Sequence, residues 1–249
     1  MTAAPAWPSG HALSHFAEID STNEEAKRLA GRGVQGPLWI VADRQTKGRG
    51  RRGRTWHSLA GNLAATLLLK PVSRTARCPQ LSFVAALSAS DLIAQCAPLA
   101  KVTLKWPNDV LLDGRKVAGI LLEASGKDDG APDWLAVGFG VNLLCYPADA
   151  EFPATSLRTV NVEPPAPKDA VTRLAAAWVE WYSAWETRGF APIRDTWLAR
   201  AAGLGRHIRA RLPDEEATGV FEGIDENGAL ILGEPSGRVR VISAGDVFF

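Results

Sequence analysis

The sequence of 249 residues is 46% hydrophobic, with 28 lysines and arginines against 27 aspartates and glutamates. It is long enough for one large domain and a small one, and its balanced charge gives no overall positive field for nucleic acid or an acidic membrane. Three scattered cysteines without a CxxC pair argue against a zinc site, redox catalysis or a disulfide framework. The start lacks the layout of a signal peptide, and no apolar run approaches the roughly 18 residues of a membrane span. We therefore expect a cytoplasmic protein that does not enter membranes.

The first half of the chain predicts a mixed β-sheet flanked by helices. Ser21 and Glu24 have the spacing of a capping box, and the apolar pattern after them predicts a helix over 22–31. Another helix is predicted over 78–96. Turn residues separate short β-rich runs, and Asp113-Gly114 predicts a hairpin between two of them. These strands are predicted over 38–42, 62–70, 102–106, 109–112, 116–124 and 134–143.

The second half predicts a long helix and then a small β domain. Prolines at 164, 165 and 167 precede a helical pattern with one apolar face, formed by Val171, Leu174, Trp178, Trp181 and Trp185. Such a tryptophan stripe is more typical of a core than of a cofactor site. After Gly203, short strands alternate with turns at 213–214, 227–228 and 236–237, as in a small antiparallel barrel. We therefore predict domains over 1–203 and 204–249.

The most unusual segment is the glycine- and arginine-rich stretch 45–56, which we call the arginine loop. Its glycines let the backbone approach a ligand, and its arginines are forked cations suited to phosphate or carboxylate. The same glycines spell GxGxxG, but no apolar helix follows Gly53 and no acidic residue stands about 20 positions on, so a dinucleotide-binding turn is disfavoured. A loop that contacts nucleic acid, with Trp56 as a stacking face, is a second alternative. Repulsion among the arginines predicts that the loop is mobile until an anion binds.

Three further motifs bring polar groups to the ends of predicted strands. Residues 105–109 (KWPND) place a cation, an amide and a carboxylate at one turn, and Lys116 opens the buried run 116–123 (KVAGILLE). Residues 138–142 (GFGVN) put two glycines in a strand, which suggests the close approach of a ligand, with Asn142 as a base-reading amide. Each motif alone is a weak signal.

In this order, the motifs at 21–23, 48–53, 105–109, 116–123 and 138–142 resemble the biotin-protein ligase family. The resemblance implies an α+β fold: a class II synthetase-like catalytic domain with a mixed β-sheet flanked by helices, and a small C-terminal SH3-like β-barrel. It implies that ATP activates biotin to biotinyl-5'-AMP, and that biotin passes to a lysine of a biotin carboxyl carrier protein of acetyl-CoA carboxylase or a related carboxylase. Only 20 residues precede the first motif, so we expect no DNA-binding domain. Whether the chain forms a homodimer stays open.

The resemblance also assigns roles to residues of the matching motifs. Lys116 would bridge the biotin carboxylate and the α-phosphate, and Arg51 would fold over the adenylate, which makes these two the catalytic candidates. The biotin-binding candidates are Ser21, Thr22, Asn23, Gln45, Arg49, Gly50, Arg51, Lys116, Gly119 and Leu121. The ATP-binding candidates are Arg49, Arg51, Arg54, Trp56, Lys105, Asn108, Asp109, Lys116 and Asn142. Mg²⁺ is expected as the counter-charge of the phosphates, with Asp109 as a candidate ligand.

Two other functions compete with this hypothesis. Lipoate-protein ligase has similar chemistry and a related fold, but its arginine-plus-glycine-triplet pattern is missing. A non-enzymatic nucleic-acid-binding module would explain the arginine loop, but not residues 116–123 or 138–142.

Overall fold

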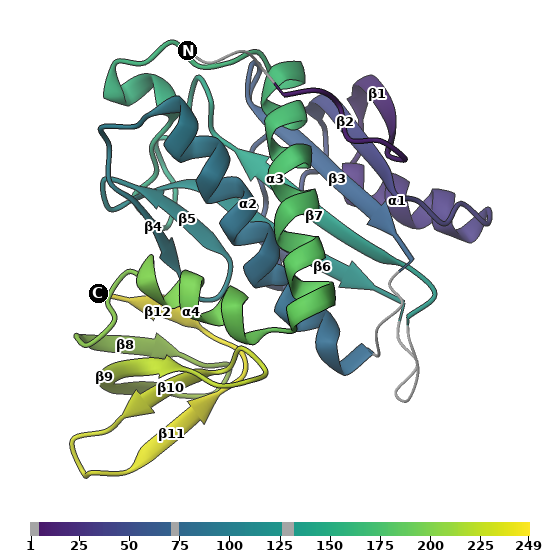
Figure 1. Ribbon diagram of the computed structural model, residues 1–249. Helices are drawn as coiled ribbons and strands as arrows, with labels where there is room; N and C mark the ends of the chain where they lie inside the picture. The colour runs from purple at the N-terminus through teal and green to yellow at the C-terminus, as the bar shows by residue number, and fades with distance from the viewer. Residues whose placement is uncertain (1–4, 71–74, 126–131) are drawn as a thin grey trace.

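The computed structural model describes residues 5–70, 75–125 and 132–249 (Figure 1). Its larger part is built on a seven-stranded sheet of order β1-β2-β3-β7-β6-β5-β4. Strands β1 and β2 are parallel and are connected through α1, whereas every other neighbouring pair is antiparallel. The predicted mixed sheet is therefore confirmed. Its strands are β1 (Ala12–Ile19), β2 (Leu38–Gln45), β3 (Leu63–Leu69), β4 (Val102–Lys105), β5 (Asp109–Leu112), β6 (Arg115–Ala124) and β7 (Leu135–Val141).

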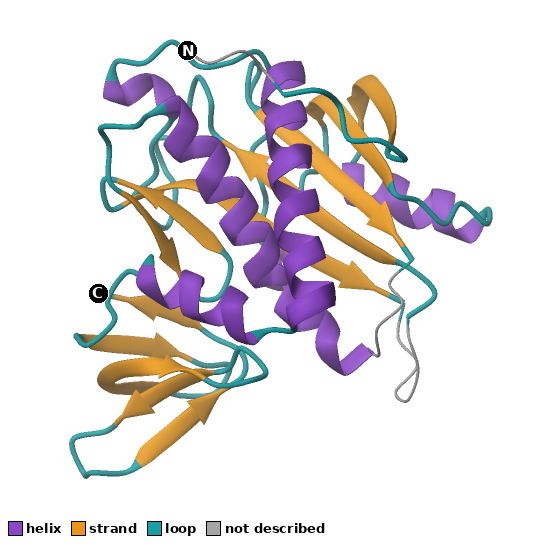
Figure 2. Ribbon diagram, viewed as in Figure 1, coloured by secondary structure: helices purple, strands orange, loops and turns teal. Residues whose placement is uncertain are grey.

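Helices cover the two faces of this sheet unequally. Helices α2 (Leu81–Cys96) and α3 (Pro167–Arg188) lie side by side across one face, and the main hydrophobic core fills the space beneath them (Figures 1 and 2). On the opposite face, α1 (Thr22–Gly31) packs through Ala26 onto Ile40, Leu68 and Ala136. Because one short helix covers only part of a seven-stranded face, the remainder of that face is open to ligands.

The tryptophan stripe of α3 belongs to the core, as its helical spacing predicts. Trp178 and Trp185 are almost fully buried, and the indole Nε1 of Trp185 donates a hydrogen bond of 2.8 Å to Gln80 Oε1. Trp181 is only partly buried, and its Nε1 donates to Asp91 at 2.6 Å. Trp181 and Trp185 therefore each combine apolar packing with a satisfied N–H group.

The burial of Trp178 predicts a large stability effect. We expect Trp178→Ala to lower the free energy of unfolding by about 3–5 kcal/mol, because it removes apolar contacts and leaves a cavity. Val179, the next residue of the same helix, is 38% exposed, so Val179→Ala should change stability by no more than about 0.5 kcal/mol. Urea titration of both variants measures the difference, and equal midpoints would contradict this assignment of the core.

The C-terminal part forms a separate antiparallel sheet of order β11-β10-β9-β8-β12. Strands β11 and β12 are its two edges, so the SH3-like unit is an open five-stranded sheet and not a closed barrel. Figure 1 shows it beneath α4 (Ala191–Ala199), through which it adjoins α2 and α3. The domain boundary between residues 203 and 204 stays a prediction. The strands are β8 (His207–Arg211), β9 (Glu216–Ile224), β10 (Leu230–Gly233), β11 (Val239–Ile242) and β12 (Asp246–Phe248).

The sequence patterns missed two elements and misplaced the ends of others by one to three residues. Strand β1 contains no fully buried residue because it is an edge strand, so it lacks the alternation that reveals a strand. Helix α4 has only nine residues, two of which are fully buried. The helix predicted from 78 begins at Leu81, since Pro79 lies in a 3-10 turn over Thr75–Gln80. Two further 3-10 turns span Arg51–Gly53 and Leu157–Val160.

The predicted capping box at the start of α1 is wrong. Ser21 occupies the N-cap position, but its side chain makes no capping hydrogen bond. Asp20 Oδ1 accepts the N–H of Ser21 at 2.7 Å, and Glu24 instead contacts Arg49 at 2.6 Å. The backbone of Ser21 and the side chain of Glu24 therefore have partners outside the predicted capping box. No helix in the described part of the chain is long and apolar enough to cross a bilayer.

Candidate active site

The candidate site is built on two rows of residues that cross the open face of the sheet. In the first row, Lys105, Asp109, Gly119 and Gly140 are successive partners across β4, β5, β6 and β7. The second row lies two residues further along the strands and joins Leu121, Gly138, Thr66 and Ile40. Residues two apart in a strand face the same side, so both rows share the face on which Ile40 packs against α1. Motifs far apart in the chain are thereby brought onto one surface.

Glycines in both rows make room for other side chains. A Cβ on Gly138 would lie 2.3 Å from Asn23 Oδ1, and one on Gly140 would lie 2.2 Å from Trp56 Cε2. The ring of Trp56 also lies close to Gly119, because a Cβ on that glycine would be 3.3 Å from the ring. Side chains of the protein itself therefore approach both glycines closely, and the group at Gly140 is an indole ring from the arginine loop. The approach of a ligand to residues 138–142 stays a prediction.

This contact predicts a specific effect of a single methyl group. Gly140→Ala should displace the Trp56 ring, since overpacking of this kind commonly costs about 1–3 kcal/mol. If Trp56 contacts adenine, KM for ATP should rise about tenfold or more. The matched control is Gly223→Ala, because a Cβ at that strand position meets nothing within 4 Å. Equal KM values for ATP in the two variants would show that Trp56 does not contribute to nucleotide binding.

A buried polar network forms one end of the site, at the start of α1. Gln45 Oε1 accepts hydrogen bonds from the N–H and the hydroxyl of Thr22, at 2.8 and 3.0 Å. Asn23 Nδ2 donates to Glu123 Oε2 at 2.8 Å, and its Oδ1 accepts from Thr66 at 2.6 Å. Thr66, which the sequence analysis missed, is fully buried in this network. These fixed amides and hydroxyls suit a compact neutral ligand that needs a few oriented hydrogen bonds.

Cations gather in the middle of the site. Lys116 Nζ lies 2.7 Å from Asp109 Oδ1 in an ion pair, although the direction of approach is not that of a hydrogen bond. Lys105 is buried, with its Nζ 4.0 Å from the centre of the Phe152 ring. Burial lowers the pKa of Lys105 from its ordinary value, because the ammonium has lost much of its hydration.

Internal carboxylates hold three of the four arginines of the loop. Arg49 contacts Glu24 at 2.6 Å and Glu123 at 3.0 Å, whereas Arg52 and Arg54 contact Asp246 at 3.5 and 2.8 Å. These ion pairs contradict the premise that the arginines of the loop repel one another until an anion binds. The pairs also separate Arg49, beside the polar network, from Arg54, which reaches the C-terminal sheet.

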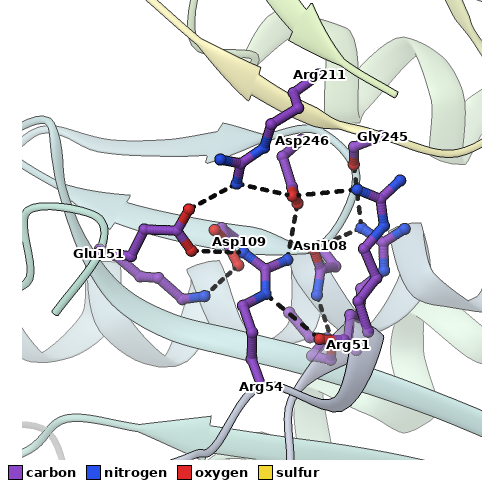
Figure 3. A network of polar contacts seen from close by, with 11 residues as sticks. Arg51, Arg54, Asn108, Asp109, Glu151, Arg211, Gly245 and Asp246 are labelled. Atoms are coloured by element: carbon purple, nitrogen blue, oxygen red, sulfur yellow. Dashed lines mark hydrogen bonds and ion pairs between the residues drawn. The ribbon is translucent and has the colours of Figure 1, made fainter. Parts of the chain in front are cut away.

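Arg51 is bound differently from the other three arginines. Its Nη1 donates to Asn108 Oδ1 at 3.3 Å and to the carbonyl of Gly245 at 3.5 Å (Figure 3). Within the described ranges, Arg51 forms no ion pair with a carboxylate, and the same holds for Lys105. Burial also lowers the pKa of Arg51. Two partly desolvated cations without a carboxylate partner therefore face the same space, which is the charge arrangement of an anion-binding site.

Two further asparagines of the site, Asn108 and Asn142, are held by backbone groups. Asn108 Nδ2 donates to the carbonyl of Ile120 at 2.6 Å. The buried Asn142 donates from Nδ2 to the carbonyl of Thr155 at 3.0 Å. That bond fixes the segment that passes Lys116, whose own backbone pairs with Pro153 and Thr155.

Every residue that the sequence analysis assigned to biotin or ATP lines one cavity. Sequence reasoning missed Thr66 and the residues that line the cavity from outside the motifs, among them Glu151, Phe152, Asp246 and Val247. For Asp246 and Val247 a signal existed, because residues 244–247 (AGDV) loosely resemble the small C-terminal domain of the biotin-protein ligase family. Glu151 and Phe152 lie in a loop without any distinctive pattern. The roles of the individual residues stay predictions.

Known proteins with these features share one chemistry. The family described as Biotin/lipoate A/B protein ligase matches residues 15–142, and the Biotin protein ligase C terminal domain matches residues 203–249. A biotin–[acetyl-CoA-carboxylase] ligase of Paracoccus denitrificans is 48% identical, covering 94% of this chain and 99% of its own. The chain belongs to the biotin protein ligase family.

More distant relatives preserve the same architecture. A bifunctional ligase/repressor BirA of Bacillus subtilis is 33% identical to this ligase, over 94% of this chain and 73% of its own. A solved biotin protein ligase from Aquifex aeolicus, in complex with biotin and ATP, aligns with a TM-score of 0.82 at 30% identity. That alignment covers 95% of this chain and 97% of the other, so both sheets belong to the shared fold.

Proposed function

We infer that this ligase activates biotin with ATP to biotinyl-5'-AMP and transfers the biotinyl group to a lysine of a carrier protein. The observation that carries this inference is the pair of carboxylate-free cations, Arg51 and Lys105, in the cavity that Lys116 also lines. The buried polar network lies at one end of that cavity. The neutral ring system of biotin matches the polar part of the cavity. Its anionic tail and the phosphates of ATP match the cationic part.

The first step joins two anions, so the fixed cations are the main catalytic groups. The biotin carboxylate attacks the α-phosphorus of ATP, an acyl–phosphate bond forms, and pyrophosphate leaves. Negative charge accumulates on the phosphate oxygens during this step, where preorganised donors stabilise it. We assign Lys116 to the contact with both anions, and Arg51 and Lys105 to the phosphate oxygens. Asp109 Oδ1, which lies 2.7 Å from Lys116 Nζ, orients the ammonium until the substrates bind.

The second step consumes the adenylate. The neutral amine of the carrier lysine attacks the acyl carbon, an amide bond forms, and AMP leaves with the bonding electrons. We propose that the carrier is a biotin carboxyl carrier protein of acetyl-CoA carboxylase, since the relative from Paracoccus denitrificans is named for that substrate. The cations that stabilised the first transition state also stabilise the departing AMP.

We propose that Mg²⁺ enters with ATP and neutralises phosphate charge. Asp109 has a buried oxygen, Oδ1, without an aligned hydrogen bond, and therefore fits as a single ligand. Across the described residues, no group of three histidine, cysteine, aspartate or glutamate side chains is placed to hold a metal. The other ligands would then come from phosphate oxygens and water, as is common for Mg²⁺.

The structure disfavours the nucleic-acid alternative. A nucleic-acid contact needs arginines free to meet a phosphate backbone, but Arg49, Arg52 and Arg54 are paired with internal carboxylates. The family model covers lipoate ligases as well as biotin ligases, and the named relatives and the solved complex favour biotin over lipoate.

Biotin-dependent exchange of labelled pyrophosphate into ATP tests the proposed function. Exchange should require biotin and should not be supported by lipoate at the same concentration. Exchange with lipoate but not with biotin would reassign the substrate, and no exchange with either acid would contradict adenylation.

A further inference from the structure

We propose that Asp246, in the C-terminal sheet, is a positioning residue that holds the arginine loop so that Arg51 faces the cavity. This proposal rests on the proposed function for its kinetic part, and on contacts within the protein for its structural part. It gives the C-terminal sheet a defined task in the first step of the reaction.

Asp246 is the point at which three arginines meet. Its carboxylate accepts hydrogen bonds from Arg54 at 2.8 Å, from Arg211 at 3.4 Å and from Arg52 at 3.5 Å (Figure 3). Only 7% of the residue is exposed. Burial by itself would raise the pKa of Asp246, but the hydrogen bond from Arg54 and the neighbouring guanidinium charges lower it overall. The group is therefore an anion at neutral pH, at the boundary between the loop and the sheet.

The position of this carboxylate is fixed by the C-terminal sheet. Asp246 pairs with Arg211 across β12 and β8, and Val247, the next residue, is buried in the core. The carbonyl of Gly245 accepts the hydrogen bond from Arg51. Gly245 and Asp246 together therefore contact Arg51, Arg52 and Arg54 from one rigid strand end.

Glu151 completes a ring of charges around the same point. It contacts Arg211 at 2.6 Å and Arg54 at 3.3 Å. Arg54 and Arg211 are thus each shared between Glu151 and Asp246, as Figure 3 shows. The ring joins the arginine loop, the segment after β7 and the C-terminal sheet through side chains that are distant in the sequence.

The ring explains how Arg51 stays directed at the cavity. Four arginines within residues 49–54 repel one another at short range, and the repulsion is strong where water is excluded. Asp246 draws Arg52 and Arg54 to the C-terminal side, which leaves Arg51 in contact with neutral oxygens only. Without this carboxylate, Arg52 and Arg54 would be free to move, and Arg51 would lose its fixed direction.

The test compares Asp246→Asn with a matched control, Asp214→Asn, an exposed aspartate of the same C-terminal part. In ligand-free full-length protein, Asp246→Asn should raise hydrogen exchange of the amides of residues 48–56 and protease cleavage there by roughly tenfold. Single-turnover formation of biotinyl-adenylate should slow by roughly ten- to a hundredfold, since a small displacement of a positioned group has effects of this size. Asp214→Asn should change neither quantity.

Two further variants distinguish positioning from damage to the C-terminal sheet. Arg54→Gln removes the same contact from the loop side, so it should reproduce both effects, and the double variant should be no worse than either single one. Asp246→Glu keeps the charge and should recover part of the adenylation rate. Additive losses in the double variant, or unchanged loop exchange in Asp246→Asn, would overturn the proposal, as would increased exchange with an unchanged adenylation rate. A wild-type protein without biotin-dependent pyrophosphate exchange would contradict the proposed function instead, and the ligand-free exchange data would still decide whether Asp246 anchors the loop.

Discussion

Lys116→Ala is expected to slow the formation of biotinyl-adenylate by about a hundredfold or more, with only a modest loss of biotin affinity. The Lys116 ammonium lies beside Gly119, a member of the first row of residues across the sheet, and is 2.7 Å from Asp109 Oδ1. Removal of one donor at a site of developing charge commonly has an effect of this order. Biotin can still find positive charge in the arginine loop, so the loss should appear in the chemical step rather than in binding.

Three companion variants make this result specific. Lys116→Arg should recover little activity, because a broad planar guanidinium cannot replace a compact ammonium between two oxygens. Lys116→Ala also leaves the Asp109 carboxylate unpaired, so the double variant with Asp109→Asn shows how much of the loss comes from that uncompensated charge. Lys27→Ala, at an exposed position of α1, is the control. Adenylate formation by Lys116→Ala within a few-fold of wild type would move the catalytic assignment to the arginine loop.

Arg51→Gly is expected to release the activated intermediate. Arg51 is the one arginine of the loop that has no carboxylate partner among the described residues, so it has no internal anion to exchange for the adenylate phosphate. Losing its charged hydrogen bonds should weaken retention of the adenylate by about tenfold or more, since such bonds contribute about 1.5–3 kcal/mol. The escaped mixed anhydride then acylates lysines outside the specific carrier.

Labelling of an unrelated lysine-rich protein measures this escape. The variant is incubated with biotin, ATP and the bystander, and a streptavidin blot reports its biotinylation. Arg51→Ala separates loss of the side chain from the added flexibility of glycine, and Lys47→Gly applies that flexibility at an exposed position of the same loop. An unlabelled bystander together with normal labelling of the carrier would refute the prediction.

The sequence by itself determined the elements with strong periodicity and the types of residue in the site. The period of 3.6 places Trp178 and Trp185 in the core, and the glycines at 138 and 140 are two apart, so a strand puts both on one face. The residues assigned to biotin or ATP all line one cavity, because their motifs lie in, or next to, strands of the same sheet. Patterns of this kind depend only on residues that are close in the chain, so they can be found in a single sequence.

Only the tertiary structure decided which charges neutralise which. Asp246 is 192 residues from Arg54 in the chain, and Glu123 is 74 residues from Arg49, so no local pattern connects them. The four arginines look equivalent in the sequence. Packing of the C-terminal sheet pairs both Arg52 and Arg54 with Asp246, and it leaves Arg51 without an ion pair among the described residues. The same holds for Lys105, whose burial against Phe152 follows from the path of an irregular loop. Electrostatic roles depend on distance in space and on loss of water, and both are set only when the strands pair and the two sheets meet.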